Sequence, residues 1–246
     1  TPTRAIMVVT NKSRNDYDSS YDLDDPVTGD GLKIPARLEN GIWTISSLGA
    51  DGHVLAERIR KLSGPVVKLD LTQPPSRTST IRLELSSVVI DALSALKKEL
   101  YLVMPWGQYT IRPGTFQTDE YFRMKALNDD LGLRLETVSP ASQYKPSTTM
   151  QFKTAVTDFR FSYLQGSGQI SRINVPIRVE LPVADISNYV QGQLGTYGYN
   201  PGKGWYKLPT VNDYSLKHVI GELDRPVAVV AATEGILPQP GVPSYI

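Results

Sequence analysis

The feature that most constrains this chain is its series of short apolar segments, each bounded by glycine, proline or other turn-forming residues. Clear examples are Gly41–Ser46, Thr80–Leu85 and Leu131–Val138. In these segments apolar residues recur at every second position, which places them on one face of a strand. Long helical patterns between successive strands are missing, which argues against a doubly wound parallel sheet. The sequence therefore predicts a mainly β protein, built of antiparallel β-sandwich-like domains with a few short helices.

Three segments have the apolar spacing of a helix. We predict helices over Gly52–Leu62, Ser86–Lys98 and Val211–Gly221. In the second segment the leading serines can cap the first turn, and the closing lysines suit the negative end of the helix dipole.

The length of 246 residues suits one large domain or two smaller ones. A stretch rich in proline, serine and threonine, Val138–Thr149, is the preferred boundary. We predict an N-terminal β-rich region with an acidic loop (1–75) and a strand-helix-hairpin module (76–140). An antiparallel β-sandwich module (149–232) and a proline-rich C-terminal tail (233–246) follow.

The charge balance excludes some classes of partner. Lys and Arg number 26 against 25 Asp and Glu, whereas a duplex nucleic-acid binder needs an excess of cations to neutralise phosphates. No apolar run approaches the ~18 residues that cross a bilayer, so neither nucleic-acid binding nor membrane insertion is expected. The absence of cysteine excludes disulfides and thiolate metal sites. The chain begins at Thr1, and we expect that a leader peptide has been removed.

The residues give no pattern for catalysis. His53 and His218 lie far apart in the chain, and neither has a neighbouring group that would orient it for acid-base chemistry. Adjacent acidic pairs such as Asp119 and Glu120 do not converge on one point, because neighbours on a strand face opposite sides. We therefore predict that the protein is not an enzyme.

Six aspartates gather in the segment Asn15–Asp30, and closely spaced carboxylates are the ligands that Ca²⁺ prefers. They are Asp16, Asp18, Asp22, Asp24, Asp25 and Asp30. The spacing does not match an EF-hand loop, so a solvated acidic loop is the alternative to a calcium site. Calcium is the one candidate cofactor.

Four aromatic residues are candidates for a binding surface: Trp106, Tyr197, Tyr199 and Trp205. The two tyrosines lie two residues apart and share a face of a strand. The turn after them lets Trp205 face back across a hairpin. Such a row of rings suits the stacking of sugar rings. The alternative is that the rings fill the core of the sandwich or cover its end.

Both ends of the chain carry apolar residues that could contact a neighbouring subunit. These interface candidates are Ile6, Val8, Val9, Ile236, Leu237, Val242, Tyr245 and Ile246. The terminal segments could add a strand to another copy or fill its groove, giving a homo-oligomer or a polymer. The alternative is that they pack on their own domain.

The order of segments from about Val66 to Ala232 resembles a known kind of module, and the N-terminal third of the chain is not covered by the resemblance. Thr80–Pro113 gives an apolar strand, a short helix and a hairpin; Pro176–Pro182, Gly195–Leu208 and Pro226–Ala232 give the later strands. This order resembles the β-rich modules that precede S-layer-homology domains in secreted cell-surface proteins of Gram-positive bacteria. The resemblance implies an extracellular, cell-surface location. No S-layer-homology repeat is present, so the resemblance does not imply wall anchoring.

These observations favour a non-catalytic, secreted structural protein of the cell surface. It would be a self-assembling subunit of an S-layer-like array or an extracellular filament, joined by exchange of strands or tails. The alternative function is an accessory module that binds cell-wall polysaccharide through its aromatic residues.

Overall fold

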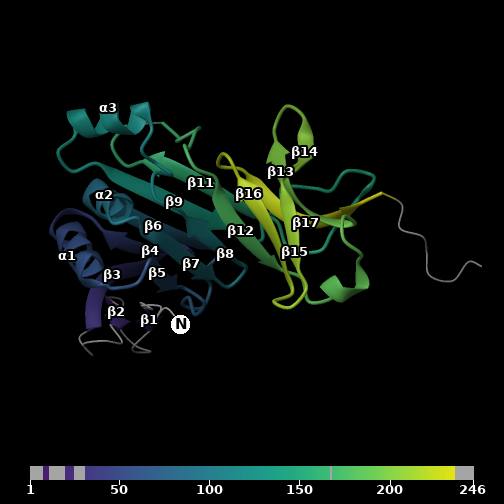
Figure 1. The fold of residues 1–246 in the computed structure, drawn as a ribbon, viewed down its shortest axis with the longest axis horizontal. Coiled ribbons are helices and arrows are strands. Elements are labelled where there is room, and N and C mark those ends of the chain that lie inside the picture. The colour runs from purple at the N-terminus through teal and green to yellow at the C-terminus, as the bar shows by residue number, and fades with distance from the viewer. Residues whose placement is uncertain (1–7, 11–19, 25–30, 167, 236–246) are drawn as a thin grey trace, which may run out of the picture.

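The computed structural model describes residues 8–10, 20–24, 31–166 and 168–235, and this part of the chain is mainly β. Its strands form one sheet of eleven strands, the large sheet, and one of six, the small sheet. The sheets pack against each other through one core, with the α-helices gathered toward one end of the molecule (Figure 1). The predicted mainly β, sandwich-like fold with a few short helices is confirmed.

The large sheet contains strands from both ends of the described chain. Its strands are β1 (Val8–Thr10), β2 (Ser20–Asp24), β3 (Gly31–Glu39), β4 (Ile42–Ser47), β6 (Thr80–Ser86), β9 (Gly132–Val138), β10 (Met150–Phe152), β11 (Thr157–Tyr163), β13 (Leu194–Asn200), β14 (Gly204–Lys207) and β17 (Ala228–Glu234). Their order is β1-β2-β3-β4-β6-β9-β11-β17-β13-β14, and β10 also pairs with β17. Among the described strands, β1 and β14 therefore stand at the two ends of this order, and β10 is a further edge strand beside β17.

The small sheet has the order β15-β16-β12-β8-β7-β5. Its strands are β5 (Val66–Asp70), β7 (Glu99–Met104), β8 (Gly107–Ile111), β12 (Ile177–Pro182), β15 (Thr210–Asp213) and β16 (His218–Leu223). Neither sheet is purely antiparallel, because β4 pairs with β6 and β5 with β7 in parallel. Every pairing formed wholly by strands after residue 149 is antiparallel, as the sequence predicted for that segment.

Helices account for the parallel pairs. They are α1 (Gly49–Lys61), α2 (Ser87–Ala95) and α3 (Asp119–Leu127), followed by a short 3₁₀ turn, Ile186–Asn188. The first helix leads from β4 to β5 and the second from β6 to β7, so each carries the chain from the large sheet to the small one. A parallel pair needs such a long connection, which a hairpin cannot supply. Two of the three predicted helices, Gly52–Leu62 and Ser86–Lys98, are thus confirmed with shifted ends.

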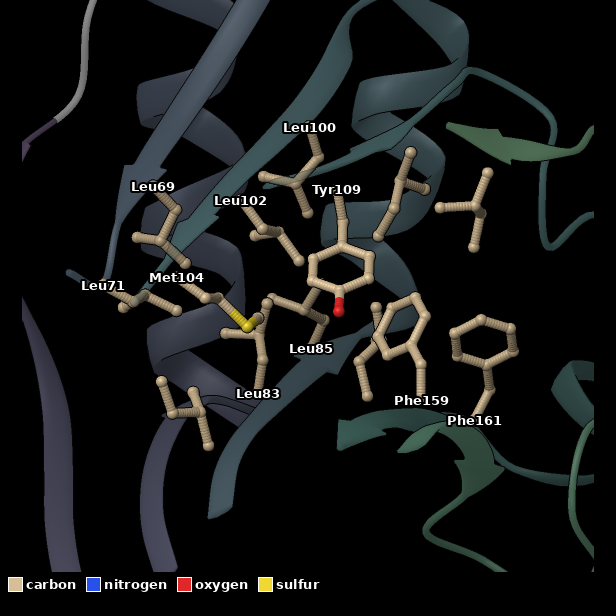
Figure 2. Close-up of a cluster of buried hydrophobic side chains, with 14 of the residues drawn as sticks. Leu69, Leu71, Leu83, Leu85, Leu100, Leu102, Met104, Tyr109, Phe159 and Phe161 are labelled. Carbon is tan, nitrogen blue, oxygen red and sulfur yellow. The ribbon is translucent and has the colours of Figure 1, made fainter. Parts of the chain in front are cut away.

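The core lies between the two sheets. In β6 every second side chain, Ile81, Leu83 and Leu85, is buried, as the period-two pattern requires. Figure 2 shows Leu83 and Leu85 beside leucines of the small sheet and the rings of Tyr109 and Phe159, whose centroids lie 4.5 Å apart. Since Tyr109 belongs to β8 and Phe159 to β11, this contact joins the sheets directly.

Both predicted modules contribute to this core. The pairing of β9 with β11 in the large sheet and of β8 with β12 in the small sheet joins segment 76–140 to segment 149–232. The predicted boundary stretch, Val138–Thr149, and the residues that follow it cover the outer face of β17. There Ala141, Met150 and Val156 pack on Val230. The stretch therefore acts as a cover over the large sheet.

The predicted helix over Val211–Gly221 is wrong, because this segment forms the hairpin of β15 and β16. The side chain of Asp213 accepts hydrogen bonds from the backbone N–H groups of Ser215 and Leu216, at 3.0 Å each, and this closes a turn. Short polar side chains compete with the helix for backbone donors in this way. Of the apolar residues read as one helix face, Leu216 lies exposed in the turn, and Val219 and Ile220 are neighbours in β16 that face opposite sides of the sheet.

The helix α3 was not predicted, although a local signal was present. Thr118 caps it by accepting a hydrogen bond from the Tyr121 N–H at 3.1 Å, and two acidic residues occupy its first turn. The helix is anchored through Tyr121, whose hydroxyl donates to Asp91 of α2 at 2.7 Å. The apolar face of α3 is short, so the sequence lacks the extended helical spacing of apolar residues that would predict this helix.

The C-terminal tail begins later than predicted. Thr233 and Glu234, assigned to the tail from the sequence, are the last residues of β17. Thr233 pairs with both Gln151 and Leu194, so the strand is held on both sides up to its end.

Candidate functional site

Four aromatic rings gather on the outer face of the large sheet, away from the main core. Tyr199 and Trp205 face each other across the β13–β14 hairpin, with ring centroids 5.2 Å apart. Tyr144 and Phe152 come from the segment that covers this face, and their centroids lie 5.0 Å from Tyr199 and 5.2 Å from Trp205, respectively. Tyr144 also contacts Trp205. In all four of these pairs the rings meet edge to face, which is a favoured geometry for aromatic pairs. We call Tyr144, Phe152, Tyr199 and Trp205 the aromatic cluster.

The four aromatic residues proposed from the sequence as a binding surface lie in different environments in the structure. Tyr197 shares a face with Tyr199 as predicted, but it is only 3% exposed and its hydroxyl donates to Glu234 at 3.2 Å. Trp106 packs against the main core. Tyr197 is therefore a buried packing residue. Trp106, Tyr199 and Trp205 are all half-buried, Trp106 against the main core and the other two in the aromatic cluster.

A surface groove of about 470 Å³ adjoins the cluster. It lies where β17 begins: Asp158 of β11 pairs with Ala228, the first residue of β17. Beyond that point β11 continues to Tyr163 and β13 to Asn200, without β17 between them. The groove is lined by Tyr144, Tyr199 and Tyr206, and by Asp158, Arg160 and Arg225. We call it the tyrosine groove.

An ion pair between a buried carboxylate and an exposed guanidinium forms one side of the tyrosine groove. The Asp158 side chain is only 4% exposed; it accepts hydrogen bonds from Arg160 Nε at 2.9 Å and from the Tyr144 hydroxyl at 3.3 Å. Burial and the nearby Asp158 charge raise the pKa of Tyr144, so its hydroxyl stays protonated at neutral pH. The same carboxylate raises the pKa of Arg160. This network fixes the Tyr144 ring against Tyr199.

A second guanidinium lies on the connection between β16 and β17. Arg225 donates from Nε and Nη2 to the two carboxylate oxygens of Asp224, at 3.1 and 2.9 Å. This bidentate pair lowers the pKa of Asp224 and raises that of Arg225. Both side chains are about half exposed, at 52% and 54%, so the pair is accessible to solvent.

The tyrosine groove combines flat rings with groups that donate and accept hydrogen bonds. Among the described residues, Asp158 supplies the one carboxylate that lines the groove. It already accepts hydrogen bonds from Arg160 and from Tyr144. Glycoside hydrolysis by acid-base chemistry typically uses two carboxylates across a cleft. The described lining of the groove therefore does not contain the carboxylate pair of that mechanism.

The two histidines lie apart, as the sequence indicated. His53 is exposed on α1, and His218 of β16 lies with Nδ1 3.3 Å from Glu180 on the outer face of the small sheet. Within the described ranges no group of three histidine or acidic side chains could hold a metal ion. Of the calcium candidates, Asp22 and Asp24 lie in β2; Asp16, Asp18, Asp25 and Asp30 lie outside the described residues.

The proposed interface residues fall mostly outside the described part of the chain. Val8 and Val9 lie in β1, where they pair with Asp24 and Leu23 of β2. The others, Ile6, Ile236, Leu237, Val242, Tyr245 and Ile246, lie outside the described residues. Exchange of terminal segments therefore stays a prediction.

Sequence reasoning missed the polar half of the groove. Asp158 and Arg160 are two residues apart, a spacing that places both on one face of a strand, and this was the available signal. Tyr144 gave no signal, because only the tertiary fold brings it beside Tyr199.

Comparison of the chain with protein-family models, with curated proteins and with solved structures gives no match. In the described part of the chain, no helix has the length and apolar character needed to cross a membrane.

Proposed function

We propose that this protein is a non-catalytic binding module whose tyrosine groove holds a polysaccharide chain. The observation that carries the proposal is the convergence of Tyr144 and Tyr199 over a groove that also contains Asp158, Arg160 and Arg225. This is the accessory-module function that the aromatic residues suggested in the sequence.

The chemistry of a sugar chain matches that composition. A sugar ring has apolar C–H groups, which pack on an aromatic face, and hydroxyl groups, which need donors and acceptors. In the groove, tyrosine rings offer the faces, while guanidinium and carboxylate groups can pair with hydroxyls.

Affinity electrophoresis tests the proposal. We expect the protein to be retarded in gels that contain at least one of hydroxyethyl cellulose, xylan or polygalacturonate. The variant Tyr199→Ala should lose most of the retardation, because it removes a ring that lines the groove. Tyr214→Ala is the matched control: Tyr214 is an exposed tyrosine outside the groove, bonded to the carbonyl of Tyr189.

Because Tyr199 also contacts Trp205, the melting temperature of each variant must be measured in parallel. A second variant, Gln169→Ala, alters the groove wall without touching the aromatic cluster. Equal migration of the wild-type protein with and without all three polymers would contradict the proposed function.

Self-assembly is the second candidate function, and one observation favours it. The large sheet ends in β1 and β14, and each of these edge strands pairs with a described strand on one side only. Such edges can add a strand from another chain. The resemblance to modules of secreted surface proteins supports an extracellular location for either function.

A further inference from the structure

We propose that the tyrosine groove selects polysaccharides that carry carboxylate groups, such as polymers of uronic acids, over neutral ones. The inference rests on the proposed function, since it names the class of chain that the same groove would hold. It follows from how the charged groups of the groove are buried.

The two partners of the Arg160–Asp158 ion pair differ strongly in exposure. The Asp158 carboxylate is 4% exposed, whereas the Arg160 side chain is 46% exposed. A ligand that enters the groove at this position therefore meets the guanidinium, while the carboxylate lies beneath it. At short range the exposed charge at this wall is positive.

A second positive group lies on another wall of the groove. Arg225 is 52% exposed and belongs to the β16–β17 connection, whereas Arg160 belongs to β11. Both arginines line the same groove, so a ligand in the groove can meet both guanidinium groups. Pro226 and Val227, which also line the groove, separate Arg225 from the start of β17.

Both guanidinium groups keep donors for a ligand. Asp158 engages Nε and Nη2 of Arg160, and Asp224 engages the same two atoms of Arg225. A guanidinium carries five N–H groups in a planar fork, so each arginine can still donate to an incoming anion. Hydrogen bonds between charged partners are about twice as strong as those between neutral groups.

A uronic acid combines the two features that the groove recognises. Its carboxylate is attached directly to the sugar ring, so one unit can stack on Tyr199 and pair with a guanidinium. A neutral sugar offers the ring but only hydroxyl groups to the arginines. We therefore expect discrimination at the level of the individual sugar unit.

The test compares two forms of one polymer by isothermal titration calorimetry at about 0.15 M salt, where contacts beyond ~8 Å are largely screened. The probes are fragments of polygalacturonate and the same fragments with their carboxylates methyl-esterified. We expect the free acid to bind at least tenfold more tightly than the ester. Arg225→Gln should weaken binding of the acid about tenfold and binding of the ester much less, because the glutamine amide can still donate to hydroxyl groups but carries no charge.

Arg60→Gln is the control variant. It removes the same charge from an exposed ion pair with Glu57 on α1, outside the groove, and should leave both affinities unchanged. Equal binding of acid and ester would overturn the selectivity while leaving the proposed function standing. Equal weakening by Arg225→Gln and Arg60→Gln would also overturn it, because the charge would then act non-specifically. Binding of neither form, together with no retardation by neutral polymers, would overturn both proposals.

Discussion

At the scale of single residues, glycine 221 sets how closely the two sheets approach near β13. A Cβ atom at this position would lie 2.6 Å from Cγ2 of Thr196, which belongs to the opposite sheet. The Thr196 side chain is fully buried and cannot move aside. The absence of a side chain at 221 is therefore a packing requirement between sheets.

We expect Gly221→Ala to lower the free energy of unfolding by about 1–3 kcal/mol, because overpacking forces the strands apart. Urea denaturation measures the change. Gly168→Ala is the control, since nothing lies within 4 Å of a Cβ atom there, and its effect should stay within about 0.5 kcal/mol. A similar stability for both variants would show that the sheets can separate without cost.

Tyr197 gives a prediction about alkaline pH. Burial, and then the Glu234 charge, raise its pKa to about 12 from the ordinary tyrosine value of 10.0. The folded state therefore keeps the phenol proton at a pH where the unfolded chain has released it. This contribution to stability is complete below about pH 10 and is lost as the pH rises toward 12.

Urea denaturation of the wild type and of Tyr197→Phe, at pH 9 and at pH 11, isolates this contribution. We expect the wild type to lose more free energy of unfolding between the two pH values than the variant does. Other ionising groups act equally in both proteins and cancel in the difference. An identical loss in both would mean that the Tyr197 phenol ionises as readily in the folded state as in the unfolded one.

At the scale of elements, α2 depends on the residue where β6 ends. Ser86 is the last residue of that strand and also the N-cap of the helix, where its Oγ accepts from the Val88 N–H at 3.2 Å. The same hydroxyl donates to Asp130 at 3.2 Å. One side chain thus ends a strand of the large sheet and begins the helix that leads to the small one.

We expect Ser86→Ala to lower the midpoint of thermal unfolding, at a cost of about 1–2 kcal/mol for the lost cap. The adjacent Ser87→Ala is a matched control, since Ser87 is also buried but its hydroxyl has no hydrogen-bond partner among the described residues. Removing that unpaired hydroxyl should be neutral or stabilising. Equal destabilisation by both changes would rule out the cap as the cause.

At the scale of the whole molecule, the end of β17 determines which truncation can remove the C-terminal tail without removing part of a strand. Glu234 pairs with Met150 and accepts the hydrogen bond of Tyr197, so the chain up to this residue belongs to the folded body. Removal of residues 233–246 would therefore cut into β17. Truncation after Gly235 leaves every strand pair of the described residues intact.

Under the self-assembly proposal, the protein truncated after Gly235 should keep its melting temperature but lose the ability to form large particles. Light scattering and negative-stain microscopy of both proteins measure the loss. If the full-length chain assembles and the truncated chain assembles equally well, residues 236–246 have no role in assembly. If the full-length chain remains monomeric at high concentration, the self-assembly proposal itself is wrong.

The sequence by itself determined the local elements of this protein. Period-two segments such as Thr80–Leu85 became strands and Ser86 became a cap, because these preferences act over a few neighbouring residues. The hairpin that faces Tyr199 toward Trp205 followed from its turn residues in the same way.

Only the tertiary structure decided which strands became neighbours. The parallel pairing of β4 with β6 and the insertion of β17 between β11 and β13 depend on hydrogen bonds between distant segments. The tyrosine groove exists because β17 begins at Ala228, and because a cover segment brings Tyr144 to Tyr199. Such contacts are selected by the burial of whole faces, which no local pattern encodes.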